Sequence, residues 1–215
     1  MQLRGSATGK LLFQTTPVVA GQPDSETPEM VSPIFRLVAH PTWTVPESII
    51  EDELKDKSDA YFRANNMTRK NGRIVQEPGP KNSLGLVKFM FPNSYNIYLH
   101  DTPARSLFQR DVRAFSHGCI RVENPNALAQ WVLGWDEARV EEAMERGSDN
   151  RTIRLDRKIP VYIAYFTAYE KDGRLHFGND LYSKDDRLAE VMNPGARPSA
   201  AMLQQLEALR KLVAE

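Results

Sequence analysis

The chain has 215 residues, of which 41% are apolar and 26% are charged, a composition typical of one folded domain with a sizeable core. Its 28 basic and 28 acidic residues leave a formal net charge of zero, which argues against binding to nucleic acid or an anionic membrane. A single cysteine excludes an intramolecular disulfide. No apolar run reaches the roughly 20 residues of a membrane span, and no secretory signal is visible.

The first third of the chain predicts short strands and then an excursion from the main fold. Residues Lys10–Thr15 and Pro17–Ala20 are β-like. Pro46 suits the first turn of a helix and is followed by acidic residues, which the helix dipole favours there. The following stretch is rich in Gly, Pro and Asn. We therefore predict that residues 34–84 form an inserted lid or capping subdomain.

Two strands are predicted next. Residues 86–91 form a short β-like run. Residues 94–100 alternate between apolar and polar side chains, as a strand with one buried face does. Ile97 and Leu99 are expected to face the core, which predicts that His100 lies on the opposite, accessible face.

Helices and a hairpin are predicted after the cysteine. Residues 126–134 and 136–147 have the pattern of two helices, with Asp136 as the N-cap of the second. Residues 152–155 and 160–169 are strand-like, and a KDGR turn after the latter predicts a hairpin.

The C-terminal tail, residues 183–215, ends on apolar residues at helical spacing. It predicts a docked terminal helix, with a partner-binding helix as the alternative. Strands are frequent along the chain and do not alternate strictly with helices. The predicted fold over residues 1–215 is therefore mainly β, with peripheral α-helices and the inserted subdomain, and not a doubly wound parallel sheet.

The cysteine stands in the string SHGC, with a second histidine, His100, 19 positions before Cys119. Cysteine attacks as a thiolate, and a nearby imidazole can accept its proton. If this stretch is extended, His117, Cys119 and Arg121 share one face because strand side chains alternate. His100 could instead approach from a different strand. The residues alone leave either histidine open as the base.

Other residues of the motif suit catalysis, and two alternatives compete with it. The amides around Gly118 could form an oxyanion hole, and Arg121 could bind a carboxylate. A lone cysteine is also often buried and inert. His100, His117 and Cys119 could alternatively ligate zinc, although no familiar fourth ligand is present.

The string HD, a loop and then SHGCIRV resembles the signature of YkuD-type L,D-transpeptidase catalytic domains, which cross-link bacterial cell walls. Three further stretches, at residues 40–50, 78–103 and 161–182, resemble the large, lid-bearing branch of that family. The resemblance covers most of residues 17–182. It implies a β-rich catalytic core, a capping subdomain inserted before the catalytic strand, and no metal or other cofactor.

The resemblance also implies catalytic roles. Cys119 matches the nucleophile and His100 the general base, with the carbonyl of Asp101 orienting the other ring nitrogen. His117 lines the site, and the amides of Gly118 and Cys119 match the oxyanion hole. The family therefore favours His100 over His117 as the base.

Substrate contacts are implied for four positions. Tyr98 matches a site-lining tyrosine, Arg121 the arginine after the cysteine, and Asp101 the aspartate after the histidine. Trp43 would form an apolar wall in the lid, with a structural role as the alternative.

The implied reaction cleaves the L-to-D bond of a peptidoglycan tetrapeptide stem, forms a thioester on Cys119 and transfers it to an amine of a neighbouring stem. Hydrolysis of the thioester (carboxypeptidase activity) and an inactive muropeptide-binding module are the alternatives. The resemblance further implies inhibition by carbapenems, no nucleic-acid partner and a place in the bacterial periplasm or cell envelope. The chain is then expected to be a trimmed or mature form. Which stem positions are linked stays open.

Overall fold

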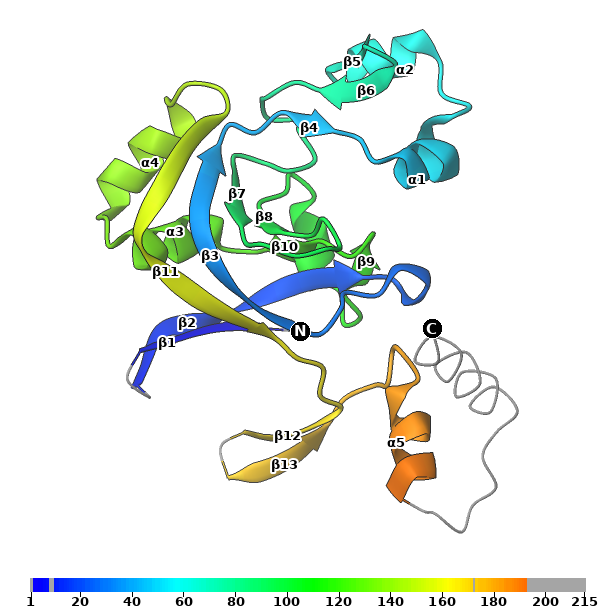
Figure 1. The fold of residues 1–215 in the computed structure, drawn as a ribbon, viewed down its shortest axis with the longest axis vertical. Helices are drawn as coiled ribbons and strands as arrows, with labels where there is room; N and C mark the ends of the chain where they lie inside the picture. Colours follow the sequence, from blue (N-terminus) through cyan, green and yellow to red (C-terminus); the bar gives the residue numbers. More distant parts are fainter. Residues whose placement is uncertain (1, 8–9, 172, 193–215) are drawn as a thin grey trace, which may run out of the picture. The chain divides into compact units, whose positions relative to one another are not determined.

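The computed structural model describes residues 2–7, 10–171 and 173–192, and the chain divides into two compact units, Met1–Ala164 and Tyr165–Glu215. The first unit is built on an eight-stranded sheet in the order β1-β2-β10-β8-β7-β3-β11, with β9 paired to β2 (Figure 1). The strands are β1 (Gln2–Ala7), β2 (Lys10–Gly21), β3 (Met30–Ala39), β7 (Val87–Met90), β8 (Leu99–His100), β9 (Ala114–Ser116), β10 (Ile120–Val122) and β11 (Arg151–Ile163). Short 3₁₀ helices follow β2 and β8, at η1 (Pro23–Ser25) and η3 (Arg105–Gln109).

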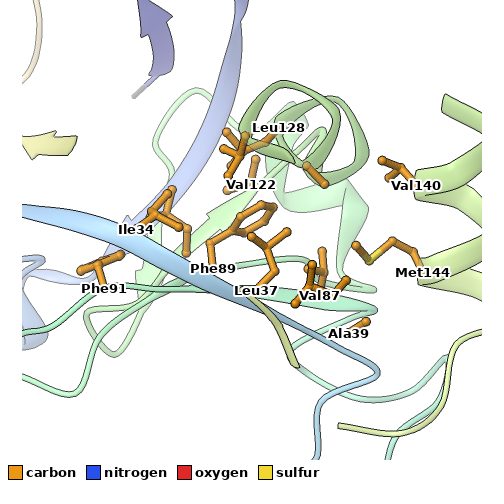
Figure 2. Packing of buried hydrophobic residues seen from close by; sticks show 14 of the residues in the cluster. Ile34, Leu37, Ala39, Val87, Phe89, Phe91, Val122, Leu128, Val140 and Met144 are labelled. Carbon is orange, nitrogen blue, oxygen red and sulfur yellow. The ribbon is translucent and has the colours of Figure 1, made fainter. Parts of the chain in front are cut away.

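One face of this sheet carries the main hydrophobic core. In β7, Val87 and Phe89 are fully buried in that core, and strand alternation directs Lys88 between them to the opposite face. Leu128 of α3 (Pro125–Leu133) and Met144 of α4 (Glu137–Glu145) pack into the same cluster (Figure 2). The predicted fold class, a mainly β core with peripheral helices, is confirmed.

The two core helices begin and end where their cap residues allow. The side chain of Asn124 accepts a hydrogen bond from the amide of Ala127 at the start of α3, and Gly134 ends that helix in the left-handed conformation, at φ 65°. Asp136 accepts from the amide of Arg139 at 2.8 Å and starts α4. The predicted N-cap at Asp136 is confirmed.

Between β3 and β7 the chain leaves the main sheet. Residues 40–86, here called the capping segment, form a small sheet in the order β4-β6-β5 and a separate apolar cluster (cyan in Figure 1). The predicted insertion started at residue 34, but residues 34–39 belong to β3, so the segment begins at His40. Its elements are β4 (Trp43–Thr44), α1 (Glu47–Ile49), the π-helix η2 (Ile50–Leu54), α2 (Asp59–Ala64), β5 (Met67–Lys70) and β6 (Arg73–Gln76).

A buried amide closes the base of the capping segment. The side chain of Asn82 is fully buried and donates to the carbonyls of Pro41, Gln76 and Glu77, at 2.9, 3.2 and 3.1 Å. Its Oδ1 accepts from the amide of Leu84 at 2.8 Å. Asn82 thus ties together backbone groups from both ends of the segment, which its irregular sequence did not indicate.

The strand predicted over residues 94–100 is wrong except at Leu99–His100. The side chain of Asn93 accepts hydrogen bonds from the amides of Tyr95 and Ile97 and donates to the carbonyl of Ile97, which curls the chain into a turn. Asn96 lies in the left-handed region, at φ 56°. Ile97 is nevertheless buried, as predicted, because the turn directs it to the core.

The C-terminal part also differs from its prediction. The two strands expected at 152–155 and 160–169 are one strand, β11, with a register irregularity between Arg154 and Ile159. In the second unit, the predicted hairpin is present only from Ala168, as β12 (Ala168–Lys171) and β13 (Arg174–Phe177), followed by α5 (Lys184–Met192). The terminal helix predicted from the apolar spacing of residues 201–215 lies beyond the described residues. Across the described part of the chain, no helix is both long and apolar enough to cross a bilayer.

Candidate active site

Three neighbouring strands, β7, β8 and β10, place one polar residue each in a row on the sheet face opposite the core. His100 of β8 is paired with Arg121 of β10 on one side and with Lys88 of β7 on the other. Paired residues of adjacent strands point to the same face, so the imidazole has a cation on each side. Tyr98, two residues before His100, stands edge-on to it with ring centroids 5.7 Å apart. The structure therefore brings Tyr98, His100 and Arg121 together.

His100 is only 4% exposed, so the predicted accessible position is wrong. Its face of the sheet is covered as well: Val38, paired with Lys88, and Val19, paired with Arg121, are also buried. The Nδ1 atom of His100 lies 2.5 Å from the backbone oxygen of its neighbour.

That contact sets the tautomer of the imidazole. A carbonyl oxygen can only accept, so Nδ1 of His100 donates its proton to the carbonyl of Asp101. Nε2 then keeps a free lone pair, the form that a general base requires. The contact between Asp101 and His100 that the family resemblance implied is present.

The surroundings of His100 favour the neutral imidazole. Burial, and next the charge of Arg121, lower the pKa of His100 to about 3; the carbonyl of Asp101 opposes this shift, and Lys88 adds to it. The imidazole is therefore neutral over the whole physiological pH range, with its base form already present before substrate binds.

Cys119 is half-buried and packs against the edge of the main core. Burial raises the pKa of its thiol, which outweighs the lowering by hydrogen bonds from Tyr98 and by the charges of Arg121 and Lys88. The thiol of Cys119 and the imidazole of His100 are therefore both neutral at rest. A preformed thiolate is thus disfavoured in this site.

A tight turn, and not a strand, presents Cys119. Gly118 has φ 101°, a conformation that favours glycine. Ser116 Oγ donates to the carbonyl of Cys119 at 2.5 Å and accepts from the amide of Gly118 at 3.2 Å. The carbonyl of Gly118 in turn accepts from buried Thr27 Oγ1 at 2.9 Å. Sequence reasoning missed Thr27, which lies 91 residues away from Gly118.

This turn changes two expectations. The shared strand face expected for His117, Cys119 and Arg121 is wrong, because β10 starts only at Ile120. The amide of Gly118 is already donated to the Ser116 hydroxyl, so of the two predicted oxyanion donors the Cys119 amide is the one this contact leaves open.

The capping segment reaches the site through Glu53. Its Oε1 lies 3.6 Å from Nε2 of His117, and its charge raises the pKa of Arg121 against the lowering effect of burial. Glu53 belongs to η2, and its side chain is 57% exposed. The charged run EDELKDKSD marked this stretch in the sequence, but nothing in the pattern distinguished Glu53 from the other acids.

We expect Glu53→Gln to loosen the capping segment without unfolding the chain. Such a partly exposed pair contributes at most about 1 kcal/mol, so amide hydrogen exchange over residues 47–57 should rise by up to about fivefold. Glu51→Gln, two residues earlier on an exposed position, is the matched control and should leave exchange unchanged. Equal exchange in both variants would show that the Glu53 contact does not hold the segment.

Asp101 has a structural role that the motif did not reveal. One carboxylate oxygen accepts from Arg105 at 2.8 Å and the other from the amide of Leu86 at 2.8 Å. The carboxylate is buried against Gly85, whose missing Cβ leaves the space it occupies. Both oxygens are thus engaged within the protein, and the substrate contact of Asp101 stays a prediction.

Gly85→Ala is expected to destabilise the protein by roughly 2–4 kcal/mol, because the new Cβ would overlap Oδ2 of Asp101 and displace a buried, hydrogen-bonded carboxylate. Gly72→Ala is the matched control: it has a similar φ, 75° against 60°, but nothing lies within 4 Å of the position its Cβ would take. It should cost only about 1 kcal/mol of backbone strain. Urea unfolding measures both, and equal losses would contradict the close-packing argument.

One further predicted position and the alternative metal site remain to be compared with the structure. Trp43 of β4 is partly buried against the apolar cluster of the capping segment, and its substrate contact stays a prediction. Among the described residues, no group of three or more His, Cys, Asp or Glu side chains is arranged to hold a metal ion. His100, His117 and Cys119 therefore do not form the three-ligand set considered from the sequence.

Known proteins are similar to this chain over most of its length. The family model described as the L,D-transpeptidase catalytic domain (YkuD) matches residues 5–163. A Haemophilus influenzae protein named "Putative L,D-transpeptidase" is 32% identical over 212 residues, covering 85% of this chain and 43% of that protein. The chain thus spans less than half the length of this relative.

Two solved structures give weaker similarity. An L,D-transpeptidase from Mycobacterium smegmatis has 16% identity and a TM-score of 0.38, over 73% of this chain and 54% of the other. The LD transpeptidase LdtMt1 in complex with imipenem has 18% identity and a TM-score of 0.36, over 72% and 53%. The assignment depends on the family model, whose match extends over well more than half of the residues. This chain belongs to the L,D-transpeptidase catalytic domain family.

Proposed function

We propose that this domain is a cysteine-dependent L,D-transpeptidase that cross-links peptidoglycan stem peptides in a bacterial cell envelope. The observation that supports this most is the fixed tautomer of His100, whose Nδ1 donates to Asp101 while Nε2 stays free. Tyr98 joins this histidine to the nucleophile, since it stacks edge-on with His100 and hydrogen-bonds to Cys119. Family membership gives the substrate class, a stem peptide with an L-centre to D-centre bond.

In the first half-reaction, Sγ of Cys119 attacks the carbonyl carbon of the L-to-D bond while Nε2 of His100 takes the thiol proton. The C–N bond then breaks, and the terminal D-residue leaves as an amine that carries this proton. The remaining stem stays bound to sulfur as a thioester. We expect the amide of Cys119 to stabilise the oxyanion that forms on the way.

In the second half-reaction, an amine of a neighbouring stem attacks the thioester carbonyl. His100 takes a proton from that amine and returns it to sulfur as the C–S bond breaks. The products are a new amide cross-link and the free thiol of Cys119. If water attacks instead, the same thioester yields a shortened stem, which is carboxypeptidase activity.

The capping segment suits the control of this second step. Glu53 brings it to His117 at 3.6 Å, next to the catalytic turn, where it can exclude water from the thioester. A carbapenem offers the same thiol a strained carbonyl, so we expect Cys119 to be acylated by drugs of this class. Loss of the carbapenem adduct in Cys119→Ala identifies the site.

The test uses purified tetrapeptide muropeptides, incubated with the wild type and with Cys119→Ala and analysed by mass spectrometry. The proposal predicts dimers that have lost one terminal D-residue per link, with fragmentation locating the joined positions. Shortened stems without dimers would make the domain a carboxypeptidase. No change in either sample would contradict the proposed chemistry and favour a muropeptide-binding module.

A further inference from the structure

Several positively charged side chains surround His100, although a general base does not require cations beside it. Lys88 and Arg121 flank it in the register of β7, β8 and β10. Arg36 of β3 is near enough that its charge lowers the pKa of Lys88, after the larger effect of burial. Cations next to an imidazole oppose its protonation, so they hinder proton uptake by His100 unless an anion joins them.

These cations have spare capacity to bind an anion. Across the described part of the chain, Nε of Arg121 is buried without a hydrogen-bond partner. The ammonium of Lys88 lies 5.4 Å above the ring of Tyr98, which leaves its three protons available for stronger contacts. Glu53 is the acidic group that acts on Arg121, and it is 57% exposed at the edge of the site. A buried guanidinium with an unsatisfied donor fits a carboxylate.

We propose that Lys88 and Arg121 bind the terminal carboxylate of the departing D-residue, and that Lys88 makes the domain selective for stems that end in a free acid. This inference rests on the proposed function, because it assigns a binding subsite to the donor stem. It extends the site to Lys88, which the motif does not include.

The dimensions of the substrate agree with this placement. The nitrogen of the leaving residue is bonded to the scissile carbonyl carbon, and its carboxylate follows after a single Cα, so the scissile carbon and the carboxylate carbon are at most about 3.7 Å apart. Arg121 follows Cys119 by two residues, so their Cα atoms are at most about 7 Å apart. The charges of Arg121 and Lys88 both reach the Cys119 thiol and lower its pKa against burial. A scissile carbonyl at sulfur therefore places the carboxylate near both cations.

Carboxylate binding also has a consequence for catalysis. The two positive charges that oppose protonation of His100 are then partly offset by the single negative charge of the substrate carboxylate. A stem with a free terminal acid would thus strengthen His100 as a base at the moment when Cys119 attacks. A stem whose terminus is blocked as an amide would leave both cations unpaired.

The experiment compares two donor stems that share the same L-to-D bond, one ending in a D-residue with a free carboxylate and the other in its primary amide. Release of the terminal residue is followed by mass spectrometry for the wild type, Lys88→Met, Lys88→Arg and Lys70→Met. Lys70 is exposed on β5 and serves as the matched control. Thermal unfolding and alkylation of Cys119 by iodoacetamide verify that each variant is folded.

The wild type and Lys70→Met should prefer the free acid in kcat/KM by about 100-fold, the scale of one lost contact to a partly buried charge. In Lys88→Met this preference should fall to about tenfold or less, because kcat/KM decreases for the acid donor and stays unchanged for the amide donor. Lys88→Arg, which keeps the charge, should retain most of it. If Lys88→Met lowered kcat/KM equally on both donors, Lys88 would act only on the Cys119 thiol and the inference would be overturned. A wild type with equal kcat/KM on the two donors would overturn it as well. A wild type that converts neither donor would instead refute the proposed function.

Discussion

Cys119→Ala is expected to lower the release of the terminal D-residue by a factor on the order of 10⁴ or more, since the proposed thioester cannot form without the thiol. Cys119 is the only cysteine of the chain, so no other thiol can substitute for it. The variant should stay folded, because the turn around it depends on Ser116, Gly118 and Thr27. Rates are measured on a tetrapeptide stem. Retained activity in this variant would contradict the assignment of Cys119 as the nucleophile.

The protonation state of the thiol gives an independent check of the same site. Burial raises the pKa of Cys119, so its alkylation by iodoacetamide should be slow at neutral pH and accelerate as the pH rises beyond the ordinary range of a thiol. Fast alkylation that does not change between pH 5 and 7 would instead indicate a preformed thiolate–imidazolium pair. That result would contradict the neutral resting state derived from the surroundings of His100.

His100→Gln is the second large effect, with an expected loss of activity on the order of 10³-fold, within the range for removal of a general base. The glutamine can donate to the carbonyl of Asp101 as the imidazole does, so the loop should hold its position. Activity on the tetrapeptide stem measures the loss. A fall of only a few fold would contradict the assignment and return His117 to consideration as the base.

The same variant should change the pH dependence of stability. The pKa of His100 is about 3 in the folded protein and near 6.5 in the unfolded chain. Between these values the unfolded chain binds the extra proton, so His100 lowers the free energy of unfolding as the pH falls below about 6.5. Urea unfolding at pH 7 and pH 4.5 should therefore show a smaller acid-induced loss in His100→Gln than in the wild type. An equal loss would show that His100 accepts protons while the protein is folded.

The predictions that held depend on local chemistry. The mainly β fold, the N-cap of α4 and the burial of Ile97 and Leu99 follow from composition, N-capping and apolar spacing over a few residues. The contact between His100 and Asp101 is also local, because the two residues are adjacent in the chain. The family resemblance pointed to it, and the backbone geometry provides it.

The predictions that failed depend on partners distant in sequence or on single polar side chains. Asn93 folds an alternating stretch into a turn because its side chain accepts hydrogen bonds from two backbone amides. The alternation of apolar and polar residues does not reveal such hydrogen bonds. The accessible position expected for His100 is wrong because its face of the sheet is buried in the folded chain, as the burial of Val19 and Val38 on the same face shows. Thr27 and Glu53 join the site from 91 and 64 residues away in sequence, through contacts that only the folded chain creates.

The most direct test of the account is the intact mass of the enzyme after brief reaction with a tetrapeptide stem whose acceptor amine is blocked, quenched in acid. The account predicts a mass increase equal to the acyl tripeptide, carried by Cys119, removed by hydroxylamine and absent from Cys119→Ala. Release of the terminal D-residue without any adduct on Cys119 would contradict it.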